Sequence, residues 1–438
     1  MQGTDAGPSC WSLFLFRYGI LLKKIQGLPL GSQMINILVA GALVGCISVC
    51  MGRKKVIFAP SSLNLIAFIL IFYMFISLIL GDKYLTGSYA IDFSGDRLKD
   101  LKNFCIMPVL FFISLNCLTE KKWIHRTLIV MGLAIILTEY YTSNQIREYS
   151  SFESREKISG TFQFLGPNEV AAFLNEYTVI LIGIFFFIKN IRVKWPLFMM
   201  ICANIYCILF LFSRGAYLGL FAGLLVLFLF KNRKLLIPLI FIGLFWQTIL
   251  PERVIERISQ TKSETGELDT SAQRRINIWE ESLEIFQKNF IVGIGLGVFG
   301  HLGMDLGDTH NIYVKYLVEQ GLVGITIFLI LIFCFLRMGY VLYKKGEDDL
   351  SKGMGLGLMA CIIVLLVNNF FGNRWSYPEM STFLWVYAGL VGRLIIMAKN
   401  PGPLAEAQQK EKSKSTPFAQ KQKKKKPVIT TFNPQKKQ

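Results

Sequence analysis

Residues 320–342 read QGLVGITIFLILIFCFLRMGYVL and contain a single charged side chain, Arg337. A helix needs about 20 consecutive apolar residues to cross the hydrocarbon core of a bilayer. This stretch is therefore predicted to be a transmembrane helix. Ten further runs of the same kind occur along the chain, at 33–50, 60–80, 101–117, 124–142, 168–188, 195–212, 215–230, 234–250, 353–371 and 379–398.

A weaker apolar run, 11–27, is interrupted by Arg17, Lys23 and Lys24 and is expected either to span the membrane or to lie in its interface. The prediction is eleven or twelve helices, in a chain that is 53% hydrophobic. This pattern is typical of an all-α, polytopic membrane protein rather than of a set of soluble domains. No short apolar segment precedes a small-residue cleavage site, so a cleavable signal peptide is not expected.

The apolar runs divide the chain into four parts. Residues 1–250 are predicted to hold the first transmembrane helices, about nine with the run 11–27, and 320–398 hold the last three. Between them, 251–319 are predicted to form one large, partly helical loop. Residues 399–438, a basic tail rich in Pro, Gln, Lys and Ser, are expected to be disordered. We expect the tail to be attracted to anionic lipid rather than to nucleic acid.

Lysine and arginine cluster on every second connection between the apolar runs. Both residues favour the cytoplasmic side of a membrane in short loops. The clusters and the basic tail are therefore predicted to be cytoplasmic, which places the loop 251–319 outside. The clustered residues are Arg53, Lys54, Lys55, Lys121, Lys122, Lys189, Arg192, Lys194, Lys231, Arg233, Lys234, Lys344 and Lys345.

The nine cysteines lie mostly inside apolar runs, and the loop 251–319 contains none. No CxxC pair occurs, so structural disulfides and a zinc site are not expected. The glycine-rich run GIGLGVFGHLG (293–303) lacks the strand–turn–helix context and the acidic residue of a dinucleotide-binding fingerprint. The sequence therefore predicts neither a metal nor a cofactor.

Arg214 lies in LFSRGAYLG (211–219), where two apolar runs meet with almost no loop between them. An arginine at a membrane boundary is costly and usually has a partner or a function. One interpretation is a snorkelling side chain that anchors the turn. No acidic residue lies next to it in the sequence, which favours an anionic ligand.

Arg274 and Arg275 follow Thr270 and Gln273, whose capping-box spacing predicts the start of a helix. Arginines in a first helical turn oppose the helix dipole unless an anion binds there. Guanidinium groups at a helix N-terminus suit a phosphate or diphosphate, and neutralisation by neighbouring carboxylates is the alternative. Four apolar residues at helical spacing predict an apolar face on this helix: Ile276, Trp279, Leu283 and Phe286.

His310 is the most informative of the three histidines. Asp308 or Thr309 is predicted to cap a helix that begins at His310 and runs to Gly321, and the dipole of that helix would disfavour the imidazolium cation. A neutral imidazole accepts a proton and suits a general base, a role that contributes about 10²–10⁴ in rate. The alternative is a structural hydrogen-bonding role beside Asn311.

A further segment, REKISGTFQFLGPNEVAAFL (155–174), is expected outside the membrane up to the point where the run 168–188 begins. Pro167 and Asn168 are predicted to open a helix there. Arg155 adds positive charge on the same side as the other candidates. We therefore take Arg155 and Asn168 as secondary candidates for the site.

These motifs, in their order and spacing, resemble the O-antigen ligase and polymerase superfamily over roughly residues 150–400. The motifs that carry the resemblance are SRGA at 213–216, R-x-x-x-W from Arg275 to Trp279, GIGLGVF at 293–299, HNIYVKYLVEQGLVG from His310, and SGTF with PN upstream. The resemblance implies a GT-C-like, metal-independent glycosyltransferase of the bacterial inner membrane. It implies Arg214 and Arg275 as essential arginines, with Arg274 as the alternative to Arg275, and His310 as the catalytic histidine. We expect substrate contacts from Arg155, Asn168, Trp279 and Asn311.

The resemblance also implies the partners of the protein. The donor would be a glycan on undecaprenyl diphosphate at the periplasmic face, transferred with inversion. The acceptor would be lipid A-core in a ligase, which is our leading expectation, another repeat unit in a polymerase, or a protein in an O-oligosaccharyltransferase. A bicarbonate-like transporter is the non-enzyme alternative, although few ionisable residues lie inside the apolar runs.

Overall fold

The described part of the protein consists of helices and connecting turns, and no strand occurs in it. The predicted all-α class is therefore confirmed. The run 11–27 and the basic tail lie outside the described residues. The computed structural model describes residues 34–52, 58–89, 95–149, 154–162, 165–259, 270–303 and 308–399.

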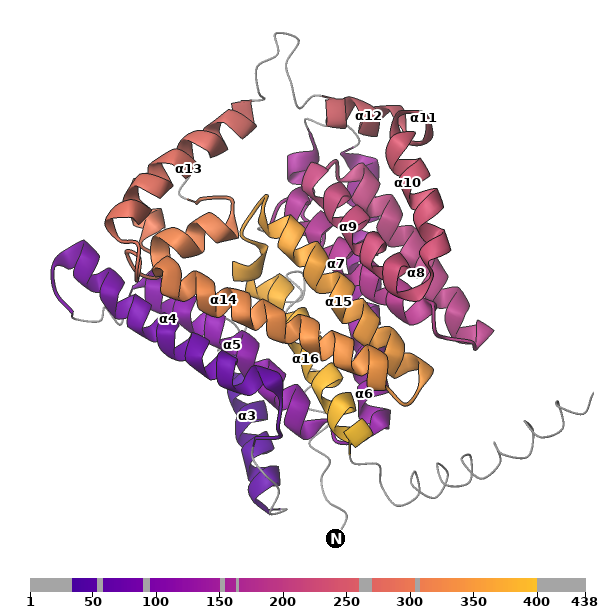
Figure 1. Cartoon of the computed structure of the whole chain (residues 1–438), viewed down its shortest axis with the longest axis horizontal. Coiled ribbons are helices and arrows are strands. Elements are labelled where there is room, and N and C mark those ends of the chain that lie inside the picture. Colours follow the sequence, from indigo (N-terminus) through magenta and orange to yellow (C-terminus); the bar gives the residue numbers. More distant parts are fainter. Residues whose placement is uncertain are drawn as a thin grey trace, which may run out of the picture. The chain divides into compact units, whose positions relative to one another are not determined.

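Eight helices in the described ranges are long and apolar enough to span a membrane, which supports the predicted polytopic architecture (Figure 1). Two more helices, α3 (Met34–Gly52) and α5 (Asp96–Cys117), cover the predicted runs 33–50 and 101–117. The chain to Ile395 forms one compact unit and the remainder a second, and all contacts described below lie within the first. The eight are α4 (Ser62–Thr86), α6 (Lys121–Glu148), α7 (Pro167–Phe185), α8 (Ile191–Phe210), α9 (Arg214–Lys231), α14 (Ile312–Lys345), α15 (Asp349–Asn369) and α16 (Pro378–Lys399).

The run 234–250 differs from its prediction as one spanning helix. It is divided into the end of η3 (Arg233–Leu235), α10 (Leu236–Leu244) and α11 (Trp246–Ile249). The nine residues of α10 rise only about 14 Å, against a hydrocarbon core of about 30 Å. Gly243, a weak helix former, lies two residues before the break at Phe245. Hydrophobicity alone could not reveal this interruption.

Helices α7 and α15 form the centre of the bundle. The spanning window of α7 is 83% buried, whereas that of α8 or α9 is 22% buried. Small residues allow the two central helices to approach closely, as is common in membranes. A Cβ atom on Gly183 of α7 would lie 2.8 Å from the Cα atom of Gly357 in α15, so a larger residue would force them apart.

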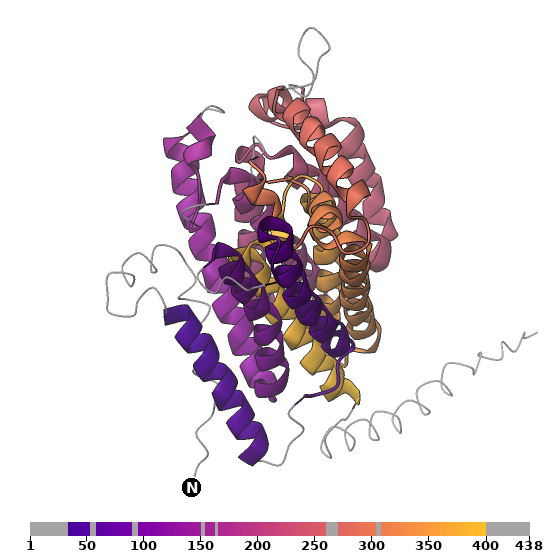
Figure 2. The ribbon, with the colours of Figure 1, turned by 90° about the vertical axis from the view of Figure 1, so that its left-hand side faces the viewer.

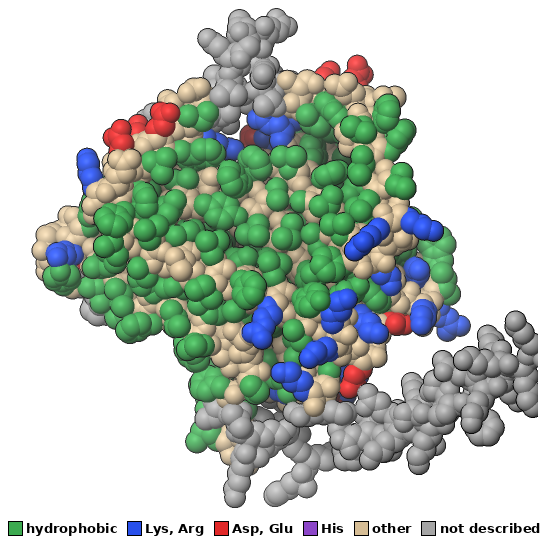
Figure 3. All heavy atoms as spheres, viewed as in Figure 1, with side chains coloured by type: hydrophobic (Ala, Val, Ile, Leu, Met, Phe, Trp, Pro, Cys, Tyr) green, Lys and Arg blue, Asp and Glu red, His purple; other side chains and the backbone are tan. Residues whose placement is uncertain are grey.

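One end of the bundle carries the basic turns predicted to be cytoplasmic. Lys121 approaches Glu347 (3.4 Å), and Lys189 approaches Asp349 (3.3 Å), so the turns after α5, α7 and α14 meet there. Figure 3 shows Lys and Arg side chains gathered at this lower end of the view. At the other end, α7, α9 and α14 begin, close to α12 (Glu252–Ser259) and α13 (Thr270–Lys288) in Figure 1.

The glycine-rich run identified in the sequence packs against a break in α14. Gly321 has φ 64° and ψ −164°, a conformation open essentially to glycine alone. The break frees the carbonyl groups of Val318 and Glu319. These accept hydrogen bonds from the N–H groups of Ile294 (2.9 Å) and Gly295 (2.8 Å). The glycines therefore allow two backbone segments to pair.

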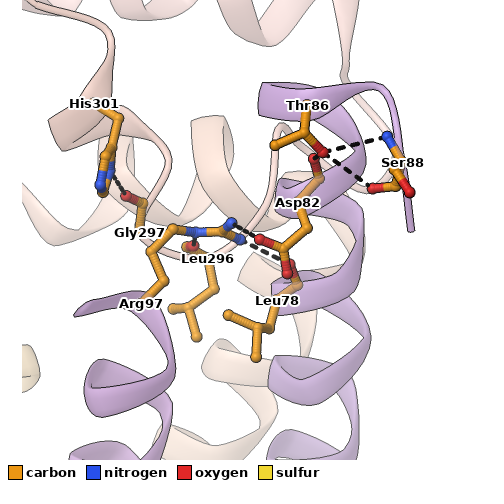
Figure 4. Close-up of polar contacts among 8 residues, drawn as sticks. All are labelled: Leu78, Asp82, Thr86, Ser88, Arg97, Leu296, Gly297 and His301. Atoms are coloured by element: carbon orange, nitrogen blue, oxygen red, sulfur yellow. Dashed lines mark hydrogen bonds and ion pairs between the residues drawn. The ribbon is translucent and has the colours of Figure 1, made fainter. Parts of the chain in front are cut away.

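A buried arginine, Arg97 of α5, ties α4 and α5 to this run (Figure 4). Its guanidinium forms an ion pair with Asp82 (2.6 Å) and donates to the carbonyls of Leu78 (2.7 Å) and Leu296 (2.7 Å). Helix α4 also lies beside α14 in Figures 1 and 2, where the Tyr73 hydroxyl donates to the Gln320 carbonyl (2.6 Å). The glycine-rich run is thus attached to the membrane helices α4, α5 and α14.

Candidate active site

A cavity of about 650 Å³ lies at the end of the bundle opposite the basic turns. In Figure 3, Lys and Arg side chains gather at the upper end of the view, between α12 and α13. Glu156 is the acidic residue among the side chains that line the cavity. Such an excess of guanidinium groups suits an anion. Five arginines line the cavity: Arg155, Arg214, Arg257, Arg275 and Arg374.

The structure brings together most of the residues proposed from the sequence. Arg155, Asn168, Arg214, Arg275 and Trp279 all line the cavity, although they belong to four separate segments. The cavity wall does not include Arg274, His310 or Asn311. Arg274 is exposed, which favours Arg275 of the two adjacent arginines.

Arg214 is positioned by the turn between α8 and α9. Phe212 adopts a left-handed conformation (φ 52°), and its carbonyl accepts hydrogen bonds from Arg155 Nη1 (3.1 Å) and Arg257 Nε (3.4 Å). Arg155 Nη1 also binds the Leu211 carbonyl (3.0 Å). Cations are stabilising where a helix exposes its last carbonyl groups. Burial lowers the pKa of Arg155 from its usual value, and an arginine stays protonated nonetheless.

The N-terminus of α9 itself faces the cavity. Arg214 is its first residue, and the cavity wall runs from Ser213 to Leu218. The Ser213 side chain does not cap the helix. The first N–H groups of a helix, together with its dipole, form a ready anion site. The turn therefore presents a guanidinium group and a helix N-terminus to the same space.

Arg374 and Arg257 are residues that sequence reasoning missed. Arg374 lies in η5 (Arg374–Ser376), is 5% exposed and forms an ion pair with Glu169 of α7. Arg257 lies on α12, within the loop 251–319. In the sequence, Arg374 is one arginine in the short connection 372–378. Nothing local in the sequence shows that this connection lies beside α7 and the other arginines.

Helix α13 carries Arg275 and Trp279 to the cavity, and its predicted apolar face is only partly buried. Leu283 is 43% exposed and Ile276 lines the cavity, so neither belongs to the core. The core on this side is formed by Ile278 together with residues of the glycine-rich run and Val318 of α14. Trp279 and Phe286 pack against this core, so the predicted apolar face is confirmed at these two residues and not at Leu283.

His310 lies beside the cavity, in the loop that leads into α14. Trp279, in the cavity wall, donates from Nε1 to the carbonyl of the preceding residue, Thr309 (2.9 Å). The predicted cap was wrong: α14 begins at Ile312, and Asn311 is its N-cap, whose Oδ1 accepts from the N–H group two residues on (3.0 Å). Asn311 is 3% exposed, and its side chain serves as the cap of α14.

The pKa of His310 is lowered from its usual value, chiefly by burial. The charges of Arg275 and Arg374 lower this pKa further, while Asp308 opposes them. A neutral imidazole was expected from a helix dipole, and the structure gives the same direction with burial as the main cause. His310 also has φ 48°, a left-handed conformation that is uncommon for residues other than glycine and often occurs at functional sites.

Residues 197–329 match the family model for O-antigen ligases. Over these residues the chain is similar to O-antigen ligases, and we call this region the O-antigen ligase domain. The resemblance inferred from the motifs is therefore confirmed at the level of the superfamily, whose members are membrane enzymes that transfer glycans. The ligase domain runs from α8 into α14 and contains Arg214, Arg257, Arg275 and His310. No curated protein matches the chain.

Several parts of the site lie outside the O-antigen ligase domain. Arg155, Asn168 and Arg374 line the cavity but fall before residue 197 or after residue 329. Among the described residues, no group of three or more His, Cys, Asp and Glu side chains could hold a metal ion. The positive charge at this cavity comes from guanidinium groups on the ligase domain and on the helices around it.

Proposed function

We propose that the protein transfers a glycan from undecaprenyl diphosphate to an acceptor hydroxyl, with lipid A-core as the acceptor. The observation that carries this proposal is the cavity in which five arginines meet the N-terminus of α9. A diphosphate is the part of such a donor that needs this concentration of positive charge. The match of residues 197–329 to O-antigen ligases supports glycan transfer as the chemistry.

Arg214 and Arg275 hold the diphosphate and stabilise the charge that develops on it as it leaves. Charged donors aimed at a developing anion contribute most when they are fixed before the reaction. Arg155 and Arg257 act indirectly, because they fix the turn before Arg214 through the Phe212 carbonyl. Arg374 is held by its ion pair with Glu169 and adds positive charge to the cavity wall.

His310 removes the proton from the acceptor hydroxyl. The acceptor oxygen then attacks the anomeric carbon of the donor sugar, and the bond from that carbon to the diphosphate oxygen breaks with inversion. The leaving group departs as undecaprenyl diphosphate and keeps the electron pair of the broken bond. The lowered pKa of His310 supports the role of base, because the imidazole is then neutral near pH 7.

The orientation of the bundle supports a periplasmic site in a bacterial inner membrane. The basic turns at one end favour the cytoplasm. The arginine cavity lies at the other end, so we place it at the periplasmic face and the basic tail inside. Undecaprenyl diphosphate bearing a glycan would meet the cavity from the outer leaflet.

The proposal is tested by transfer in vitro, with purified protein, a synthetic undecaprenyl-diphosphate glycan, rough lipopolysaccharide as acceptor, and chelator throughout. We expect product with the wild type, and a loss of about 10²–10³-fold for Arg275→Ala, as for the loss of one oxyanion donor. Arg274→Ala is the matched control, because this neighbour is exposed and does not line the cavity. Equal losses in both variants would contradict the assignment.

The same assay separates the acceptors. Extension of the donor glycan without product on lipopolysaccharide would indicate a repeat-unit polymerase. Transfer to a protein acceptor would indicate an O-oligosaccharyltransferase. If the donor is not consumed with any acceptor or under any condition, glycan transfer itself is the wrong proposal.

A further inference from the structure

A second cavity, of about 600 Å³, lies between α6, α7 and α8. Its walls are apolar along most of their length, with Ile129 and Ile136 from α6 and Leu197 and Met200 from α8 among them. Two aromatic residues, Tyr177 and Tyr387, close its inner side and are each 1% exposed. We call this cavity the α6–α8 crevice.

The crevice exists because α6 and α8 meet through small or flexible residues. A Cβ atom on Gly132 of α6 would have only the end of Met200 within reach, at 3.8 Å. Pro196 lies inside α8 and lines the crevice as well. The space beside Gly132 is therefore open to a chain-like apolar ligand rather than filled by a side chain.

Two basic side chains, His125 and Arg192, line the crevice at the end of the bundle where the basic turns lie. The Nδ1 atom of His125 donates to the Lys121 carbonyl (2.7 Å), so this ring is held by its own helix and Arg192 is the cation left for a ligand. The carboxylates nearby are engaged elsewhere: Asp349 with Lys189 (3.3 Å) and Glu347 with Lys121 (3.4 Å). Among the described residues, the exposed Arg192 side chain forms no ion pair.

We propose that the α6–α8 crevice binds one phospholipid of the cytoplasmic leaflet. An acyl chain lies between α6 and α8, and the phosphate binds Arg192. The combination of an apolar slot within the span and a cationic mouth at its boundary matches a phospholipid, whose anionic phosphate joins apolar chains. The arginine cavity lies at the opposite ends of α7 and α8, so this site is separate from the transfer reaction.

The test is lipid retention by native mass spectrometry, on full-length protein purified in detergent and then incubated with phosphatidylglycerol. We expect one lipid to survive washing on the wild type, and retention to fall at least about tenfold in Gly132→Leu, which fills the crevice, and in Arg192→Gln. Arg126→Gln is the matched control, because Arg126 stacks over Trp123 (4.7 Å) and does not line the crevice. Phosphatidylcholine should be retained less than phosphatidylglycerol, since its head group has no net charge.

Equal retention by Gly132→Leu and the wild type would overturn the proposal, as would equal losses in Arg192→Gln and Arg126→Gln. If Gly132→Leu does not fold, Leu197→Trp fills the same space from α8 and decides the matter. If undecaprenyl phosphate were retained in preference to phosphatidylglycerol, the ligand of the crevice would be a carrier lipid. That result would contradict the assignment to a phospholipid. The rate of glycan transfer by Arg192→Gln should equal that of the wild type. A loss of lipid retention can therefore be distinguished from a failure of the proposed transfer reaction.

Discussion

His310 and Arg275 are coupled through charge, although they belong to different segments of the chain. Arg275 on α13 lowers the pKa of His310, whereas Asp308, two residues before the histidine, raises it. Burial is the main cause of the lowered pKa, and the same guanidinium that is proposed to bind the donor lowers the pKa of the proposed base further. Substitutions of Arg275 and Asp308 should therefore shift the pKa of His310 in opposite directions.

We predict that the rate of transfer falls as pH decreases through the pKa of His310, below its usual value of 6.5. A base acts only in its neutral form, so a lowered pKa extends activity to lower pH. Arg275→Gln removes a cause that lowers this pKa, and the acidic limb should move to higher pH. Asp308→Asn removes a cause that raises it, and the limb should move to lower pH.

The measurement is kcat/KM against pH for the three proteins. His310→Ala should reduce the rate about 10²–10⁴-fold and leave no limb in this range. Shifts of the same sign in Arg275→Gln and Asp308→Asn would exclude His310 as the titrating base.

At the scale of elements, the sequence predicted where helices lie better than where they break. Apolar runs identified the eight spanning helices because hydrophobicity is a local property. A helix from His310 was predicted to end at Gly321, and α14 does break there. The break at Phe245 was not predicted, because the run around it is uniformly apolar. At the break in α14, the freed carbonyl groups accept hydrogen bonds from the N–H groups of Ile294 and Gly295. The sequence of α14 alone cannot predict this pairing.

We predict that Gly321→Ala destabilises the protein by about 2 kcal/mol or more. Its backbone conformation costs a non-glycine residue about 1–3 kcal/mol. A Cβ atom there would also lie 2.4 Å from the Ile291 carbonyl oxygen, so one of two paired segments must move. Gly87→Ala is the control, since Gly87 also has a positive φ (75°) but nothing within 4 Å of an added Cβ.

The melting temperature in detergent checks this prediction. Gly87→Ala should lower the melting temperature slightly, through backbone strain alone. Gly321→Ala should lower it clearly more. The pairing of the glycine-rich run with α14 would be unimportant to stability if the two variants melted together.

At the scale of the whole molecule, the two ends of the helix bundle differ: the basic turns lie at one end and the arginine cavity at the other. The cavity draws its arginines from η2 (Ser154–Lys157), α9, α12, α13 and η5, and all of them meet where α7, α9 and α14 begin. The sequence indicated Arg155, Arg214 and Arg275 separately, through motifs. It could not indicate Arg374 or Arg257, because their value comes only from which connections share an end of the bundle.

The last prediction concerns the side of the membrane on which each end lies. Residues 234 and 252 are separated by α10 and α11, neither of which spans alone. Even so, Lys234 belongs to the basic end and Glu252 opens α12 near the cavity, so the two should lie on opposite sides. In a cysteine-free background, Glu252→Cys should react with an impermeant maleimide in spheroplasts. Lys234→Cys should react only after permeabilisation, and the reverse pattern would place the arginine cavity in the cytoplasm, where a periplasmic glycan donor could not reach it.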